Sequence, residues 1–209
     1  MTSASLKAFG FDCSLKPAAS GSSSTQALLD QFFAELAKLG VDGDVVRAVD
    51  YNIKPGVKSD EGDGDEWPAL RKRLLEADIL VIGSPIWLGQ PSSVSKRVLE
   101  RMDAFLEEKD DRGRMPSYGK VALCCVVGNE DGAHHVGAEI CQALFEVGFT
   151  IPAGGSTYWV GEAMGSKEYK EFKTPPKVVD QWNQMLASNT VHLARLLKSQ
   201  SYPGIAGGR

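Results

Sequence analysis

The sequence predicts an α/β fold in which helices cover both faces of a five-stranded parallel sheet. Apolar runs alternate along the chain with amphipathic segments of helical spacing. Two of these runs, 79–82 and 121–127, contain no polar side chain, as expected for strands that are buried on both faces. Unusual loops follow the first, third and fourth predicted strands. Ligands of such sheets bind beyond the carboxyl ends of the strands, so we expect these loops to form one site.

The composition limits the class of protein. The 209 residues suffice for one domain with a sizeable core, and the net charge of −4 gives no reason to expect nucleic-acid binding. No apolar run is long enough to span a bilayer, and the N-terminal residues lead into a strand without a signal peptide. The four cysteines form no C-x-x-C pair. We therefore expect a cytoplasmic protein with reduced thiols, no membrane partner and no metal site.

The first half of the chain supplies two strands and two helices. We expect the strands at about 7–11 and 44–49, and the helices at about 24–39 and 66–77. Gly40 is a natural end for the first helix, and Asp65 is a plausible cap for the second. The acidic, glycine-rich segment 50–65 is expected to be a mobile loop. A Ca²⁺ loop over 60–66 is the alternative, although the EF-hand spacing and its terminal Glu are absent.

The second half contributes three strands and three helices. We expect strands at about 79–83, 121–127 and 150–159, and helices at about 92–107, 133–147 and 176–198. The last helix carries apolar residues at helical spacing, and the tail 200–209 reads as loose. The sequence therefore predicts one domain over 1–209, with its core at about 6–160.

The first loop joins a strand, a run of small hydroxyl residues and the start of a helix. The run is Ser20-Gly21-Ser22-Ser23-Ser24-Thr25, and no carboxylate lies between Cys13 and Thr25. Hydroxyls and free N–H groups at a helix start can face one phosphate, whose charge the helix dipole favours. Neither a Walker A ending nor a dinucleotide fingerprint is present, which favours a mononucleotide such as FMN. A solvated loop with a serine N-cap is the alternative.

The second loop, 84–91, suits a flat ring. Pro85 restricts the backbone, Trp87 offers an aromatic face, and Gly89 allows the chain to approach a ligand closely. Backbone N–H groups of 87–89 can bond the ring edge of a flavin and tune its reduction potential. The alternative is that Trp87 is a core or interface residue.

The third loop, 128–135, contains small residues and five polar side chains. Gly128, Asn129 and Gly132 allow close approach to a ring edge and a ribityl chain. Glu130 and Asp131 are awkward neighbours for an anionic reduced flavin, so we expect them to face solvent or to cap the next helix. The adjacent histidines 134 and 135 lack partners at metal-ligand spacing, so we do not expect a zinc site. One of them could instead lie near the flavin as a proton donor or polar contact.

In these three loops the sequence resembles the flavodoxin-like NAD(P)H-dependent FMN reductase and quinone reductase family. Segment 84–93 is similar to the family's ring-binding loop, 127–134 to its third flavin loop, and Ser14 with 22–25 to its phosphate site. The resemblance covers about 7–166 and implies a flavodoxin-like three-layer sandwich with strand order 2-1-3-4-5. The stretch 16–21 is an insertion relative to the short loops of quinone reductases. The cofactor contacts implied are Ser14, Ser22, Ser24, Thr25, Pro85, Ile86, Trp87, Leu88, Gly89, Gly128, Asn129, Gly132 and Ala133.

The resemblance implies that FMN binds noncovalently and takes a hydride from NADPH or NADH. The electrons would pass to a quinone, free flavin or other small-molecule acceptor, and we name no catalytic acid or base because the cofactor performs the chemistry. Tyr158 and Trp159 either line the substrate side or pack as core or interface residues. We expect a homodimer or homotetramer.

Two other classes of function compete with this one. A flavodoxin-type electron carrier without a nicotinamide site is the runner-up, although docking by charge would favour stronger acidity than −4. A flavin-free regulatory module on the same fold is the third class. A phosphoacceptor domain needs a carboxylate where this chain has Gly83-Ser84.

Overall fold

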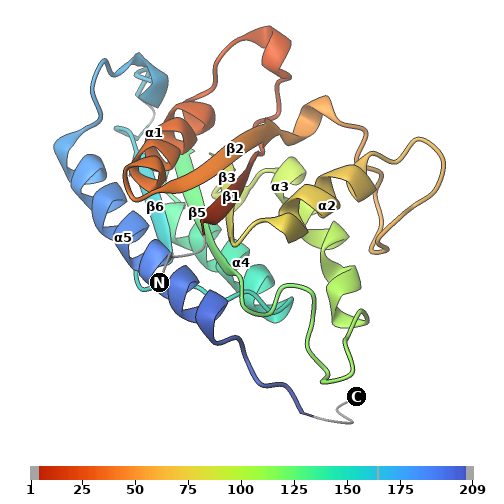
Figure 1. Cartoon of the computed structure of the whole chain (residues 1–209). Helices are drawn as coiled ribbons and strands as arrows, with labels where there is room; N and C mark the ends of the chain where they lie inside the picture. Colours follow the sequence, from red (N-terminus) through yellow and green to blue (C-terminus); the bar gives the residue numbers. More distant parts are fainter. Residues whose placement is uncertain (1–4, 164, 206–209) are drawn as a thin grey trace.

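The computed structural model describes residues 5–163 and 165–205, and its elements form three layers (Figure 1). The strands are β1 (Leu6–Asp12), β2 (Val41–Arg47), β3 (Ile79–Trp87), β4 (Gln90–Pro91), β5 (Val121–Gly128) and β6 (Ser156–Val160). The α-helices are α1 (Ser24–Lys38), α2 (Trp67–Glu76), α3 (Ser93–Arg101), α4 (Ala133–Glu146) and α5 (Lys177–Ser199). Short 3-10 turns are η1 (Ala18–Ser20), η2 (Ala48–Asp50), η3 (Asp103–Leu106) and η4 (Tyr169–Glu171).

The sheet has the order β2-β1-β3-β5-β6, and neighbouring strands in this path are parallel. This confirms the predicted flavodoxin-like order, with β4 added as a short strand antiparallel to the end of β3. Helices α1 and α5 cover one face of the sheet, and α2, α3 and α4 cover the other. Successive residues of a strand point to opposite faces, so Cys124 packs in one core and Cys125 in the other. All four cysteines are free thiols.

Among the described residues, no helix combines the length and the apolar character needed to cross a membrane.

The two edge strands begin at other residues than predicted. β2 starts at Val41 rather than at 44, because its exposed residues 42–44 pair with β1 without any hydrophobic pattern. β6 starts at Ser156, whereas Thr150 forms only an isolated bridge to Val121. An edge strand has a neighbour on one side only, so its sequence is a weaker signal than that of a central strand.

The acidic segment 50–65 ends in a buried ion pair that the sequence did not predict. Asp65 Oδ2 lies 2.8 Å from Arg101 Nη2, and both side chains are fully buried. Burial raises the pKa of Asp65, but hydrogen bonds from Arg101 and from the backbone N–H groups of Glu61, Trp67 and Lys54 outweigh it and hold the pKa well below its usual range. The segment is therefore anchored to α3 by its last residue.

Two further differences concern the ends of helices. α3 ends at Arg101, and the turn η3 replaces the remainder of the helix that was predicted to reach 107. After α5, the tail that was predicted to be loose makes specific contacts in its described part. Tyr202 Oη lies 2.9 Å from Thr150 Oγ1, and the Ile205 N–H donates to Arg112 O at 2.8 Å. Residues 206–209 lie outside the described residues.

Candidate functional site

The segments that follow β1, β3 and β5 meet at the carboxyl edge of the sheet. The Cys13 N–H donates to Gly83 O at 2.9 Å, and the Ser92 hydroxyl donates to Cys13 O at 2.7 Å, so the first and second loops are joined. The Leu88 N–H donates to Glu130 Oε1 at 2.7 Å and joins the second loop to the third. The structure thus brings together the three segments that the sequence predicts to meet.

A buried ion pair supports the first loop from the end of the sheet. Asp12 and Arg47 are register partners on β1 and β2, and Arg47 Nε donates to Asp12 Oδ2 at 2.9 Å. The Ser14 hydroxyl donates to Asp12 Oδ1 at 2.5 Å, and the Ser23 hydroxyl donates to Oδ2 at 3.1 Å. Arg47 Nη1 donates to Gly21 O at 2.9 Å. Because both ends of the loop are bonded to this pair, its conformation depends on the pair.

The start of α1 lies next to this ion pair, because its N-cap residue Ser23 is bonded to Asp12. The Ser23 hydroxyl caps the helix by accepting from the Gln26 N–H at 2.9 Å. Within the described residues, the backbone N–H groups of Ser24 and Thr25 have no hydrogen-bond partner. Ser22 is exposed beside them. The arrangement suits an anion such as a phosphate.

The residues predicted to contact phosphate differ in what their side chains already do. The hydroxyl of Ser14 is used by Asp12, so Ser14 lies beneath the loop rather than on its open side. Ser24 Oγ accepts from the Lys170 N–H at 3.3 Å and keeps its own proton to donate. Asp12 and Arg47 were not predicted, because 35 residues separate them in the sequence and only the pairing of β1 with β2 brings them together. The stretch between Cys13 and Thr25 contains no carboxylate, as noted from the sequence, but the Asp12 carboxylate directly before it bonds to both ends of the loop.

The insertion 16–21 is held against the segment that follows β2. It contains η1, and the Ala18 N–H donates to both carboxylate oxygens of Asp50, at 3.0 and 3.2 Å. Figure 1 shows η1 in the upper part of the molecule, next to the turn at the end of β2. The insertion is therefore held by residues at the end of β2 and in the turn that follows it.

The second loop is a tight β-hairpin, whereas the sequence predicts an irregular loop. β3 continues to Trp87, which pairs with Gln90 across the turn Leu88-Gly89. Both turn residues have positive φ, 54° and 74°, as in the type I′ turns that close two-residue hairpins. The side chains of Trp87 and Leu88 are 54% and 90% exposed, so the hairpin presents apolar surface at the rim. Ile86 is buried in the core, which leaves only its backbone for a ligand.

The third loop packs directly against this hairpin. A Cβ atom at Gly132 would lie 2.9 Å from Gly89 Cα, and one at Gly128 would lie 2.8 Å from Ile86 Cβ. Both glycines are therefore needed for the close approach of the two loops. Glu130 does not cap α4, since its carboxylate accepts from the hairpin tip. Ala133 is buried at the start of α4.

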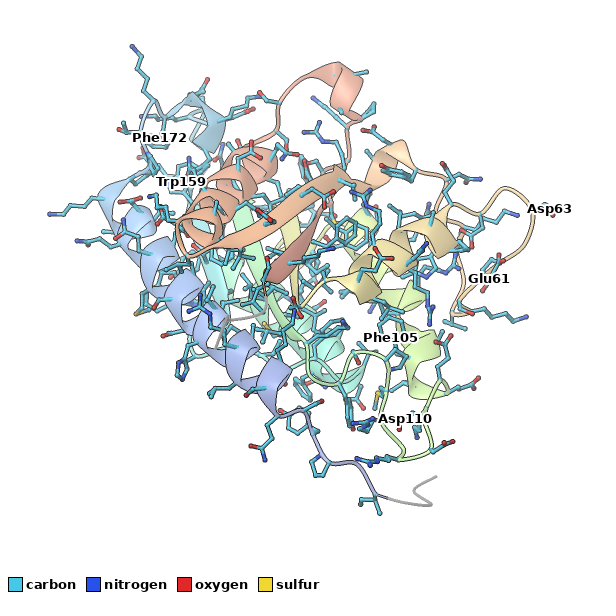
Figure 2. All side chains as sticks on the ribbon, viewed as in Figure 1. Glu61, Asp63, Phe105, Asp110, Trp159 and Phe172 are labelled. Atoms are coloured by element: carbon cyan, nitrogen blue, oxygen red, sulfur yellow. The ribbon has the colours of Figure 1, made fainter. Side chains whose placement is uncertain are left out.

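A fourth segment, described at 161–163 and 165–172, links the third loop to the first and was not predicted as part of the site. Asn129 Nδ2 donates to Gly165 O at 3.3 Å at one end, and the bond from Lys170 to Ser24 lies at the other. Three aromatic side chains pack against one another and hold the segment in place, namely Trp159, Tyr169 and Phe172. Their ring centroids lie 5.4, 5.6 and 5.9 Å apart. Figure 2 shows Trp159 and Phe172 on the α1 side of the molecule.

The histidines and aromatic residues near the third loop separate into different environments. The His134 ring packs edge-on against Tyr158 at 5.0 Å, and both side chains are exposed. His135 Nε2 lies 2.8 Å from Glu139 Oε1 on the same helix. Trp159 is packed in the aromatic cluster. Within the described residues, no group of three or more His, Cys, Asp or Glu side chains is placed to hold a metal ion.

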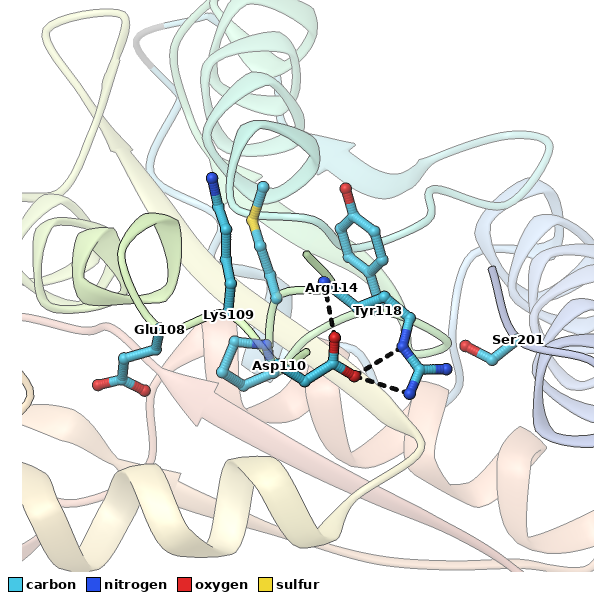
Figure 3. Close-up of a pocket in the computed structure, with 8 residues that line it drawn as sticks. Glu108, Lys109, Asp110, Arg114, Tyr118 and Ser201 are labelled. Carbon is cyan, nitrogen blue, oxygen red and sulfur yellow. Dashed lines mark hydrogen bonds and ion pairs between the residues drawn. The ribbon is translucent and has the colours of Figure 1, made fainter. Parts of the chain in front are cut away.

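A cavity of about 550 Å³ lies at the opposite edge of the sheet, before β5 (Figure 3). Arg114 Nε donates to the Asp110 carboxylate at 2.7 Å in its wall. This bond, together with the backbone N–H groups of Arg114 and Arg112, lowers the pKa of Asp110 to about 2. No residue of the three loops lines this cavity. Its lining residues are Glu108, Lys109, Asp110, Arg114, Met115, Pro116, Tyr118 and Ser201.

Residues 6–164 match the sequence profile of the NADPH-dependent FMN reductase family. The chain is 35% identical over 190 residues to 8-demethyl-8-aminoriboflavin-5'-phosphate synthase of Streptomyces davaonensis, with 86% of this chain and 74% of that protein covered. It is 36% identical over 184 residues to the divalent metal cation transporter MntH of Mycobacterium bovis, with 85% of this chain covered. The match spans only 27% of that protein's length.

A solved structure shows the same architecture. The crystal structure of RosB with the bound intermediate 8-demethyl-8-formylriboflavin-5'-phosphate matches with a TM-score of 0.86 and 34% sequence identity. The match covers 95% of this chain and 82% of that chain.

Proposed function

The chain belongs to the NADPH-dependent FMN reductase family, and on that premise we propose that it is an FMN-dependent oxidoreductase. In this proposal a hydride comes from NADPH or NADH, and a quinone, free flavin or other small molecule accepts the electrons. The observation that carries the proposal is the convergence of three loops at one edge of the sheet, joined by the bonds from Ser92 to Cys13 and from Leu88 to Glu130. That edge is where α/β sheets of this kind bind ligands.

The phosphate end of the site fits an anionic group. The free N–H groups of Ser24 and Thr25, the helix dipole and the exposed Ser22 all favour a phosphate there. The Asp12 carboxylate by itself would repel a phosphate, but the guanidinium of Arg47 offsets its charge. Ser14 contributes by fixing the loop through Asp12.

The ring end of the site fits a flat aromatic group. The exposed face of Trp87 and the backbone from Pro85 to Gly89 would contact the ring, and Gly128, Asn129, Gly132 and Ala133 would border the ring edge and ribityl chain. The Leu88 N–H already donates to Glu130, so it is not among the donors that we assign to the ring edge. When bound, FMN supplies the hydride-accepting chemistry, whereas the chain binds it, orients it and sets its electronic environment. Tyr158 and His134 lie beside the third loop and are our candidates for the acceptor side.

We also propose a homodimer or homotetramer. Four apolar side chains on the outer face of α5 are between 39% and 77% exposed, namely Val178, Trp182, Met185 and Leu196. Burying such a face against a second copy would remove apolar surface from water. Light scattering coupled to gel filtration measures the assembly, and a monomer at micromolar concentration would contradict this part of the proposal.

A second candidate function treats the flavin phosphate as the substrate. The Streptomyces relative is named as a synthase of a modified riboflavin phosphate, and the RosB structure holds a formylated flavin phosphate. The same loops would then hold the flavin while its ring is changed. An electron carrier without a nicotinamide site remains the third candidate, since it needs the same flavin contacts.

One experiment separates these functions. The absorbance spectrum of the purified protein is recorded with FMN, and NADH and then NADPH are added anaerobically in a stopped-flow instrument. Rapid bleaching of the flavin band supports the reductase, and slow bleaching with either nucleotide favours the carrier. Mass spectrometry of the flavin released after aerobic incubation detects the modifying enzyme by a changed mass. A protein that leaves the spectrum of added FMN unchanged and releases no flavin contradicts all three.

A further inference from the structure

The tip of the β3–β4 hairpin is held by one carboxylate from the third loop. The Leu88 N–H donates to Glu130 Oε1 at 2.7 Å, across 42 residues of sequence. Leu88 is the only non-glycine residue of the described chain with a positive φ. L-residues disfavour that conformation because the Cβ atom crowds the following carbonyl oxygen, so the bond to Glu130 stabilises a turn that leucine itself disfavours.

The neighbouring carboxylate is arranged differently. Asp131 is exposed and accepts from the Gly132 N–H at 2.7 Å, within its own loop. Glu130 is half-buried, and within the described residues no cationic side chain pairs with it. Of the two acidic residues in the third loop, Glu130 is the one whose carboxylate is bonded to the hairpin backbone.

We infer that Glu130 is a positioning residue for the flavin and that its charge makes the site prefer oxidised over reduced FMN. The inference rests on the proposed function, in which residues 85–89 contact the ring. Reduction adds negative charge to the ring, and a carboxylate bonded to the hairpin backbone opposes that charge at short range. By thermodynamic linkage, weaker binding of the reduced form lowers the reduction potential of the bound flavin.

Three variants separate the charge of Glu130 from its hydrogen bond. Glu130→Gln keeps an oxygen that can accept from the Leu88 N–H but removes the charge. Glu130→Ala removes both the charge and the bond. Asp131→Asn is the matched control, because it removes the same charge from the adjacent exposed position. For each protein, dissociation constants for oxidised and reduced FMN are measured anaerobically, and the midpoint potential is measured by spectroelectrochemistry.

For Glu130→Gln we expect the ratio of the dissociation constant for reduced FMN to that for oxidised FMN to fall about tenfold. For a two-electron couple this corresponds to a rise of about 30 mV in the midpoint potential of the bound flavin. Asp131→Asn should change this ratio by less than about twofold, since solvent and salt screen an exposed charge. Glu130→Ala should weaken binding of both forms, because the hairpin tip loses its anchor.

Equal ratios for Glu130→Gln and Asp131→Asn would overturn the inference about charge. Unchanged binding by Glu130→Ala, with a melting temperature like that of the parent, would overturn the positioning role. If the parent protein binds neither form of FMN, the proposed function fails first and this inference fails with it. A parent that binds FMN and gives equal ratios for the two variants refutes the inference while leaving the proposed function intact.

Discussion

Replacing Arg47 by methionine is expected to remove the support of the first loop and to cost several kcal/mol of folding free energy. The Asp12 side chain has no exposed surface, and Arg47 Nε donates to it at 2.9 Å, so Arg47→Met leaves an unpaired charge in the interior. Removing one partner of a buried ion pair costs roughly 3–5 kcal/mol. The variant also loses the bond to Gly21 O, which ties the insertion 16–21 to β2.

The double variant Asp12→Asn/Arg47→Met supplies the control, because it contains neither charge. A buried pair replaced as a whole by neutral residues often costs little, so we expect the double variant to be more stable than Arg47→Met by about 2 kcal/mol. Urea unfolding at neutral pH measures both, and the denaturant slopes must agree for the comparison to hold. A loss below about 1 kcal/mol for Arg47→Met, or a double variant less stable than Arg47→Met, would refute the reasoning from charge burial.

Three further predictions concern separate parts of the molecule. Trp87→Ala is expected to weaken retention of FMN during gel filtration, since its exposed ring is the aromatic face of the hairpin; unchanged retention would remove Trp87 from the site. Thr25 is buried, so the charge test uses the exposed Ser22 beside it. Ser22→Glu is expected to raise the FMN dissociation constant more than Ser22→Ala, because only the glutamate sets a charge against the phosphate, and equal constants would place the phosphate elsewhere. Asp65→Asn is expected to lower stability by roughly 3–5 kcal/mol at neutral pH, because it breaks the buried pair with Arg101. The folded-state pKa of Asp65 lies below the ordinary 3.8, so its contribution is present above that pH and is lost as the pH falls toward the folded-state pKa. In urea titrations the difference in unfolding free energy between the parent and Asp65→Asn should therefore narrow below pH 3.8. A difference that stays constant would contradict the stabilising role of the Asp65 carboxylate.

The central strands could be predicted from the sequence because both of their faces are buried. The runs in β3 and β5 are apolar throughout, so pattern and structure agree there. The edge strands β2 and β6 were misplaced at their starts for opposite reasons. Polar residues at the start of β2 conceal its pairing, so the strand begins earlier than predicted, whereas Thr150 forms only an isolated bridge and β6 begins later than predicted. The boundaries of α1 and α5 fall within a few residues of those expected, since their apolar spacing is regular.

The meeting of the three loops could also be predicted, because it follows from strand order alone. Their internal conformations could not. Leucine disfavours the left-handed backbone that Leu88 adopts, and the hairpin is held by Glu130 and by the contact of Gly89 with Gly132. Such contacts join residues that are distant in the chain, and no local pattern reports them.

The sequence by itself determined the sheet, its helices and which loops share one edge, because hydrophobic periodicity and the handedness of parallel connections depend on local residue order. Only the tertiary structure decided which side chains work together at that edge. Three contacts depend on strands and loops meeting across long stretches of chain: the pairing of Asp12 with Arg47, the bond from Leu88 to Glu130 and the bond from Lys170 to Ser24. Charge, hydrogen bonding and close packing act through distance in space, and that distance is set by the whole fold.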